Sequence, residues 1–382
     1  MSGGRSDRIA SVIQAYDEQG WHRTGTAVDA ASGEWLAAEL QAAGADARLE
    51  TYPFRRLDPE ECSLTIGATR IDGLPMFDGG LTGREAVAGR LGPLGSDAEI
   101  QVAVLPAGGA APALDNARQR PGTRAIVCFT AASRPGLAPR NATAYASAPG
   151  GTPVLQVSSE FRDLIEEAAA RHDLATVAVT GAWVETTASN VLAEVPGSSP
   201  GLSPVVVMTP RSGWWQCASE RGGGIAVLLE LARMFASERP RRPVIFLAST
   251  GHELGHWGLE RFLNIRPYLA TSAPLWLHLG ASVGAALEPR PMLFCSSDAV
   301  EQVSGSALDR AGLTAVTHAP RSAVPGGESK NIHERGGSYA SLLGGSAVFH
   351  LEADRWPDAV DVDAVASFAD AASEIVRYYA ST

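Results

Sequence analysis

The chain has 382 residues, of which 45% are hydrophobic and 19% charged, and its formal net charge is −11. This length is typical of two domains, or of one large domain with an insertion, and the composition is that of an ordinary folded protein with a sizeable core. An acidic excess without basic runs argues against nucleic acid or an anionic membrane surface as a partner.

Targeting and redox signals are weak in this sequence. The opening residues lack the apolar core of a signal peptide, and no run of about 20 apolar residues predicts a membrane span. Four scattered cysteines without a CxxC pair argue against a disulfide framework or a cysteine zinc site. We therefore expect a cytoplasmic protein, and the sequence does not indicate its oligomeric state.

The pattern of residues changes along the first half of the chain. Helical periodicity predicts a helix over residues 1–20, and Asp29 is expected to cap a second helix that ends at Gly44. Alternation over residues 47–54 predicts a strand. From residue 58 to residue 187, short strand-like runs alternate with loops rich in Gly, Pro and Ala, which is typical of a small β-rich module.

A strand–helix alternation begins near Ser189. Apolar strands are predicted at 204–210, 241–250, 273–282 and 345–353, and helices at 222–238, 252–265 and 361–381. This alternation of strands and helices predicts an α/β fold in which a mostly parallel mixed sheet is flanked by helices. The predicted domains are residues 1–57 with 188–382, and an inserted smaller β-rich domain over residues 58–187.

The HELGH run at residues 252–256 has the spacing of a zinc-binding helix, in which His252 and His256 bind the ion and Glu253 is the base. A β-branched strand, however, runs up to Thr250, which puts His252 and Glu253 at a strand-to-helix turn. We therefore expect no ordinary metalloprotease helix here. His256 is expected to be a locally hydrogen-bonded histidine, with a secondary place among the metal candidates.

Ionisable side chains follow several predicted strands. They are Glu220, His252, Glu253, His278 and His350. Because the carboxyl ends of parallel strands meet at one edge of a sheet, these groups are expected to converge there. Carboxylate and imidazole ligands suit zinc, which commonly takes three protein ligands and leaves a fourth position for water.

The order of several segments resembles the zinc-dependent aminopeptidases and glutamate carboxypeptidases, with the glutaminyl cyclases as one-zinc relatives. The segments are HRTGTAVDAASGEWLAAEL, TTASNVLAEVPG, GIAVLLELAR, TGHELGHWG and FHLEADRWPDAVD, which together span nearly the whole chain. Residues 58–187 resemble the protease-associated domain that many members carry as an insertion. The resemblance implies a zinc-exopeptidase-like (phosphorylase/hydrolase-like) fold and hydrolysis of an amide or peptide bond in a small molecule or short peptide.

At the matching positions the chain departs from the family pattern. The first metal-binding His and the Asp after it fall on Pro210 and Ser212, and a later Asp ligand falls near Gly280, where no side chain is available. A two-metal site is therefore not expected. His278, two residues before Gly280, is a substitute candidate for the lost ligand, although a hydrogen-bonded core histidine is the simpler interpretation.

The remaining family positions keep groups that can bind a metal. The bridging Asp falls on Glu220, the Glu-Glu pair falls on His252 and Glu253, and the last His falls on His350. The resemblance thus implies one zinc or similar ion held by Glu220, Glu253 and His350. His252 takes the position of the general base, and imidazole suits that role because it titrates near neutrality.

Substrate contacts are predicted in the loop over residues 211–224. Trp214 and Trp215 are candidates for an apolar pocket wall, and Arg211 and Arg221 for a grip on a substrate carboxylate. Packing of both tryptophans on the sheet and pairing of each arginine with an acid is an equally good interpretation. The resemblance implies that the Gly-flanked loop over 326–337, which holds Glu328, Lys330 and His333, helps to line the mouth of the site. A solvated surface loop is the simpler interpretation and is favoured for His333.

Other classes of function stay open. The four altered positions at Pro210, Ser212, His252 and Gly280 also fit a scaffold that has lost catalysis and any metal, and now binds a peptide or small molecule. A one-zinc cyclase or transferase is a third interpretation. A Ser–His–Asp triad is disfavoured because no GxSxG motif is present.

Overall fold

The structure is a computed structural model and describes residues 4–107, 111–145 and 150–382. The helices are α1 (Arg5–Asp17), α2 (Ala27–Ala42), α3 (Pro112–Arg118), α4 (Arg162–Ala170), α5 (Gly223–Glu238), α6 (Trp257–Ile265), α7 (Leu269–Ser272), α8 (Asp298–Arg310), α9 (Ser329–Glu334) and α10 (Val362–Ser381), with short turns η1 (Ser159–Phe161) and η2 (Ala218–Gly222). The strands are β1 (Asp46–Ile66), β2 (Thr69–Pro75), β3 (Val87–Pro93), β4 (Ile100–Pro106), β5 (Ala125–Ala131), β6 (Val154–Val157), β7 (Leu174–Val195), β8 (Val205–Pro210), β9 (Val244–Ser249), β10 (Trp276–Leu279), β11 (Met292–Cys295), β12 (Thr317–His318) and β13 (Tyr339–Leu343).

The main sheet has the predicted mixed α/β architecture. Its strand order runs β7-β9-β8-β10-β13-β11-β12. Strands β9, β8, β10 and β13 are parallel, β7 is antiparallel to β9, and β11 is antiparallel to β13 but parallel to β12. Helices α1, α2, α5, α8 and α10 contribute to the core on one face, and α6, α7 and α9 to the core on the other. The fold class expected from the strand–helix rhythm is confirmed.

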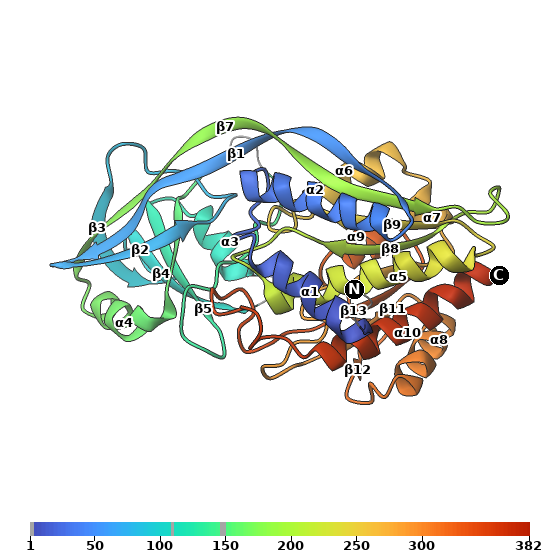
Figure 1. Cartoon of the computed structure of the whole chain (residues 1–382). Helices are drawn as coiled ribbons and strands as arrows, with labels where there is room; N and C mark the ends of the chain where they lie inside the picture. The colour runs from blue at the N-terminus through green and yellow to red at the C-terminus, as the bar shows by residue number, and fades with distance from the viewer. Residues whose placement is uncertain (1–3, 108–110, 146–149) are drawn as a thin grey trace.

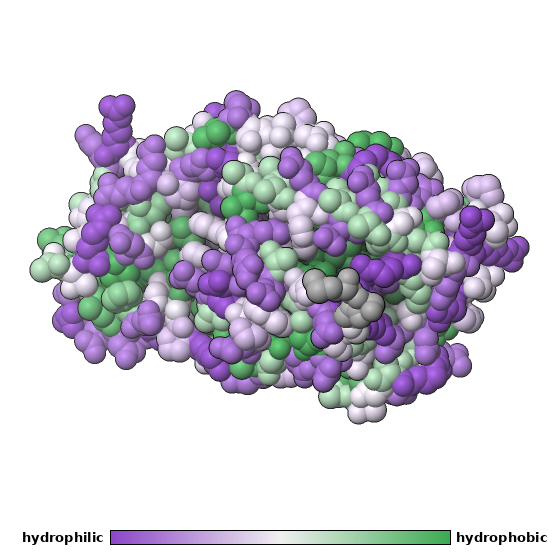
Figure 2. Space-filling model, viewed as in Figure 1, coloured by the Kyte–Doolittle hydropathy of each residue, from purple (hydrophilic) through white to green (hydrophobic). Residues whose placement is uncertain are grey.

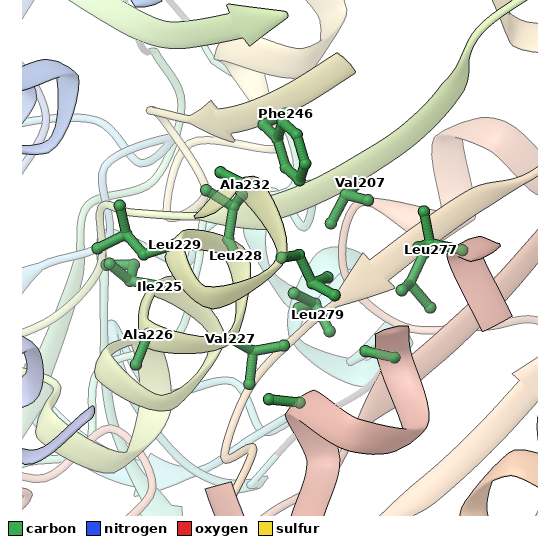
Figure 3. Packing of buried hydrophobic residues seen from close by; sticks show 14 of the residues in the cluster. Val207, Ile225, Ala226, Val227, Leu228, Leu229, Ala232, Phe246, Leu277 and Leu279 are labelled. Atoms are coloured by element: carbon green, nitrogen blue, oxygen red, sulfur yellow. The ribbon is translucent and has the colours of Figure 1, made fainter. Parts of the chain in front are cut away.

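Alternation within the central strands explains why both faces are covered. Val207 and Leu277 point into the core with α5, whereas Met208 and Trp276 point into the core with α6. Successive strand residues face opposite sides of a sheet, so a run of consecutive apolar residues requires helices on both. Figure 3 shows the first of these cores, in which Leu228 of α5 and Leu279 of β10 lie among the strand side chains.

Two long strands connect the main sheet to a second, smaller lobe. β1 and β7 pair antiparallel along almost their whole length, from Asp46 opposite Glu194 to Ile66 opposite Ala175. In Figure 1 they arch over the molecule, from the β7–β9 pairing to the lobe that holds β2–β5 and α4. That lobe has its own apolar core around Val127. The predicted boundaries at residues 57 and 187 fall inside these strands, and the likeness of the lobe to a protease-associated domain stays a prediction.

Three predicted elements differ from the structure. The second helix is capped by Thr26, whose hydroxyl accepts a bond from Asp29 N, rather than by Asp29 itself. The helix predicted over 252–265 begins only at Trp257, because His256 has a φ of 59°, which no α-helix accommodates. Residues 345–353 form consecutive turns rather than a strand, and the sheet strand at this point is the earlier β13.

The surface and the hydropathy of the helices give little information about the cellular location of the protein. In Figure 2 small hydrophobic areas alternate with hydrophilic residues over the visible face. Within the described residues, the helices are all too short or too polar to span a bilayer. Cytoplasmic location stays a prediction.

Candidate functional site

The candidate site lies at the carboxyl edge of the parallel strands, where α/β proteins commonly bind their ligands. His252 follows β9 by three residues, and His278 lies inside β10, two strands away across β8. Glu328 immediately precedes α9, and this helix packs on β10 and β13. The topology therefore brings together residues from three separate parts of the chain.

A buried carboxylate holds two imidazoles at this edge. Glu328 is completely buried, and its two oxygens lie 3.0 and 3.1 Å from His252 Nδ1. The second oxygen is also 3.4 Å from His278 Nε2, and Ser249 Oγ donates to the first at 3.3 Å. Because a carboxylate is an acceptor, His252 carries its proton on Nδ1 and its other nitrogen is left as an acceptor.

His256 completes this group. One ligand atom from each of His252, His256 and Glu328 lies within 4.8 Å of the others, which is close enough to hold one metal ion. His256 Nδ1 is 2.7 Å from Asn331 Oδ1, and the Asn331 amide in turn donates to Glu260. These four residues, His252, His256, His278 and Glu328, are called the histidine cluster below.

Electrostatics favour neutral rings at His252 and His278 beside an ionised Glu328 carboxylate. Burial, and then the charge of Arg221, lower the pKa of His252 to about 4. Burial also lowers the pKa of His278. Although burial alone raises the pKa of Glu328, the imidazoles of His252 and His256 outweigh it and hold that pKa well below its ordinary value. Neutral imidazoles and an ionised carboxylate are the states that bind metals.

A glycine makes the close approach of these rings possible. Gly327 has a φ of +60°, and a Cβ there would lie 2.9 Å from His278 Cε1 and 3.9 Å from His252 Cε1. The loop before α9 thus lies directly over both imidazoles. Glu328 has no exposed surface, so the alternative of a solvated loop does not hold at this residue.

The three residues predicted as metal ligands are divided between two environments. Glu220 and His350 lie together, with Oε1 of the first 3.3 Å from Nε2 of the second. The carboxylate of Glu253 accepts bonds from Thr24 N and Ser212 Oγ, both at 2.8 Å. Burial raises the pKa of Glu253, against the effect of those bonds. A ligand role for this trio stays a prediction.

The predicted substrate residues all have partners within the protein. Arg211 is 1% exposed and forms an ion pair with Asp29 at 2.8 Å. Trp214 stacks on Phe77 and donates to Asn141, and Trp215 donates to the carbonyl of His350. Arg221 is fully buried and lies 2.6 Å from Glu220 Oε1. Their substrate roles stay predictions.

The second lobe reaches into the site through one short segment. Pro139 O is 2.6 Å from His350 Nδ1, Asn141 accepts the bond from Trp214, and Ala142 N donates to the carbonyl of Glu253 at 2.9 Å. A small cavity beside Glu253 is lined by Phe54 and Leu57 of β1 and by Phe77 and Tyr145 of the second lobe. Residues 58–187 therefore help to shape the candidate site.

The residue that sequence reasoning missed is Glu328. Its loop is polar and Gly-rich, and those features are typical of solvent-exposed turns. The available signal was a carboxylate between a Gly-Gly pair and a helix start, and this pattern gives no information about burial. Only the packing of α9 on β10 and β13 places the carboxylate against two histidines.

Known proteins share this fold over almost the whole chain. A zinc aminopeptidase from Bacillus subtilis superposes with a TM-score of 0.76 at 17% identity, covering 99% of this chain and 95% of that one. An aminopeptidase from Aneurinibacillus sp. strain AM-1 gives 0.71 at 16% identity, covering 98% and 94%. A peptidase M28 precursor from Shewanella amazonensis SB2B gives 0.72 at 16% identity, covering 99% and 96%. The fold is thus that of the zinc aminopeptidases.

Sequence comparison adds a family match over part of the chain. Residues 190–318 match the model of peptidase family M28. Transferrin receptor protein 2 of Mus musculus is 34% identical over 110 residues, a segment that covers 28% of this chain and 13% of that protein. The family match is confined to residues 190–318, and together with the shared fold it agrees with the resemblance seen in the sequence.

Proposed function

We propose that this chain hydrolyses an amide or peptide bond of a small substrate with one metal ion, held by His252, His256 and Glu328. The observation that supports this site is the approach of their ligand atoms to within 4.8 Å of one another. Two imidazoles and a carboxylate form a ligand set found in catalytic zinc sites, which leave one position open. The proposed ligands differ from the trio Glu220, Glu253 and His350.

The donor atoms fit a zinc ion. His256 donates from Nδ1 to Asn331, so its Nε2 keeps a lone pair. His278 Nε2 is buried without a hydrogen-bond partner among the described residues, which makes it a third imidazole nitrogen at the same carboxylate. When bound, such an ion polarises a carbonyl and lowers the pKa of water towards neutrality.

We assign the proton transfer to a residue outside the metal ligands. An imidazole that binds a metal cannot also accept a proton, so the base role predicted for His252 passes to another group. Glu253 is the carboxylate that borders the small cavity, and burial raises its pKa, which makes it a better proton acceptor near neutral pH. Thr24 N and Ser212 Oγ fix the orientation of its two oxygens.

Metal analysis with matched variants tests the site. We expect about one zinc per chain in protein purified without chelator, and none in Glu328→Gln. Glu301→Gln is the matched control, because Glu301 also lies 2.9 Å from a histidine, His318, but at the surface. Metal-free wild-type protein whose stability does not respond to added zinc would reject the metal site.

A second candidate function is a binding scaffold without catalysis. It is favoured by the mutual pairing of the site's ionisable groups, since Glu220, Arg221 and Glu328 are all fully buried with partners in the chain. Hydrolysis of aminoacyl and short peptide substrates distinguishes the two. Activity that Glu253→Gln abolishes and Glu301→Gln leaves intact supports the enzyme, and its complete absence in zinc-loaded protein supports the scaffold.

A further inference from the structure

A buried arginine lies where two of the predicted metal ligands meet. Glu220 and Arg221 are consecutive residues of the π-helical turn η2, yet their side chains pair directly, with Arg221 Nη2 2.6 Å from Glu220 Oε1. The same oxygen is 3.3 Å from His350 Nε2. Glu220, Arg221 and His350 are called the arginine cluster below, and their side chains are 7% exposed or less.

The contacts of His350 leave a place for positive charge or a shared proton in this cluster. Its Nδ1 is 2.6 Å from the carbonyl of Pro139, and a carbonyl can only accept, so Nδ1 carries the proton. In the neutral ring Nε2 is then an acceptor, and it faces a carboxylate oxygen, which is a second acceptor. Two buried acceptors at this distance are stable only beside a positive charge or a shared proton.

Arg221 supplies that charge and is fixed in place by its surroundings. Its Nε donates to the carbonyl of Ser212 at 3.0 Å. Gly213 leaves room for the guanidinium, because a Cβ there would lie 3.3 Å from Arg221 Nε and 3.1 Å from Cys217 Sγ. Burial alone raises the pKa of Glu220, but Arg221 and then His350 lower it to about 2, so the carboxylate is ionised.

A divalent ion would meet strong repulsion at this position. Neither Nη1 nor Nη2 of Arg221 has a hydrogen-bond partner in the described part of the chain. Since Nη2 forms the ion pair with Glu220, Nη1 is the end of the guanidinium that presents unmatched positive charge. Charges repel more strongly in a buried environment than in water.

We propose that the guanidinium of Arg221 is a resident cation that takes the place of a metal ion between Glu220 and His350. Arg221 is a positioning residue: it holds the Glu220 carboxylate in the orientation that faces His350. This half of the site therefore binds no metal, whether or not the histidine cluster does. The chain thus keeps Glu220 and His350 at ligand positions of the family, but the side chain of Arg221 takes the place of the ion.

The decisive experiment counts zinc ions in Arg221 variants relative to wild-type protein. Arg221→Met removes the charge and keeps a similar unbranched stem, so we expect it to bind one zinc ion more per chain than wild type. Arg221→Lys keeps the charge and should show no gain. Adding His350→Asn to Arg221→Met should abolish the gain, which locates the extra ion.

Cobalt provides a second readout, because the absorption spectrum of bound Co²⁺ reports its ligands. The gain in Arg221→Met should appear as a new band that Glu328→Gln does not remove. A folded Arg221→Met protein that gains no ion would overturn the inference. If that variant does not fold, Glu220→Gln decides instead: unchanged metal content supports a resident cation, and a lost ion refutes it. Because each result is relative to wild type, metal-free wild-type protein rejects only the histidine-cluster site.

Discussion

His252 Nδ1 lies 3.0 Å from Glu328 Oε1, although 76 residues separate the two in the chain. The contact forms because the turn after β9 and the loop before α9 meet over the edge of the same parallel sheet. It fixes the tautomer of the imidazole and gives the carboxylate a partner away from water. The chemistry of the site therefore depends on this one pairing across the fold.

Replacing Glu328 should destabilise the protein more than replacing an exposed carboxylate. Glu328→Ala leaves His252 Nδ1 and the Ser249 hydroxyl without an acceptor in a buried position, at a cost of about 3 kcal/mol in the free energy of unfolding. Urea denaturation at pH 7 in the presence of chelator measures this without any contribution from metal. Glu301→Ala should stay within about 0.5 kcal/mol, and equal losses in both variants would contradict a special role for Glu328.

Zinc should stabilise the wild-type protein through the histidine cluster. An ion that binds only the native state adds about 4 kcal/mol when its free concentration is 1,000 times Kd. Thermal unfolding with and without zinc should show a large upward shift for wild type, and little shift for His256→Asn, in which one donor is lost. His333→Asn is the control, because His333 contacts Tyr339 and belongs to no ligand group among the described residues. A shift that His256→Asn retains would point to another site.

The fold could be predicted from sequence because its signals are local. Consecutive β-branched residues such as those of β8 and β9 indicate buried parallel strands, and the Gly-rich start of α5 marks a helix. The site could be predicted only in part. His252 and Glu253 were placed correctly at a turn, but the partner Glu328 lies in a loop whose burial depends on the packing of α9.

The pairing of Arg221 with Glu220 was also outside the reach of sequence patterns. In an ordinary α-helix, adjacent residues point about 100° apart and do not face each other. The π-helical turn η2 and the positive φ of Cys217 before it change that geometry. A sequence pattern that assumes regular helix spacing therefore gives no indication of the pair.

Arg211 should act on stability rather than on substrate affinity. Its guanidinium is 1% exposed and pairs with Asp29 at 2.8 Å, so Arg211→Met leaves a buried carboxylate without its counter-ion. Breaking a buried pair in this way costs about 3–5 kcal/mol. Adding Asp29→Asn should recover part of the loss in urea denaturation. A stable Arg211→Met protein with a raised KM would instead favour the substrate role predicted from the sequence.

Acid should destabilise the native state through His22, which lies far from the surface. The ring is 0% exposed, stacks on Tyr16 at 3.7 Å and bonds from Nε2 to the Tyr16 carbonyl. Burial lowers its pKa to about 3, whereas the unfolded chain has a pKa of about 6.5. Below pH 6.5 the unfolded state thus binds a proton at His22 that the native state does not bind. The free energy of unfolding therefore falls as the pH drops towards 3.

The size of this effect can be isolated with His22→Gln, which keeps an amide donor for the Tyr16 carbonyl and does not titrate. The free energy of unfolding of wild type should fall about 1.4 kcal/mol per pH unit more steeply than that of the variant between pH 6 and pH 4. Above pH 7 the difference in the free energy of unfolding between the two proteins should be constant, since His22 binds no proton there in either the native or the unfolded state. Parallel curves from pH 7 to pH 4 would mean that His22 has the same pKa in the native and unfolded states.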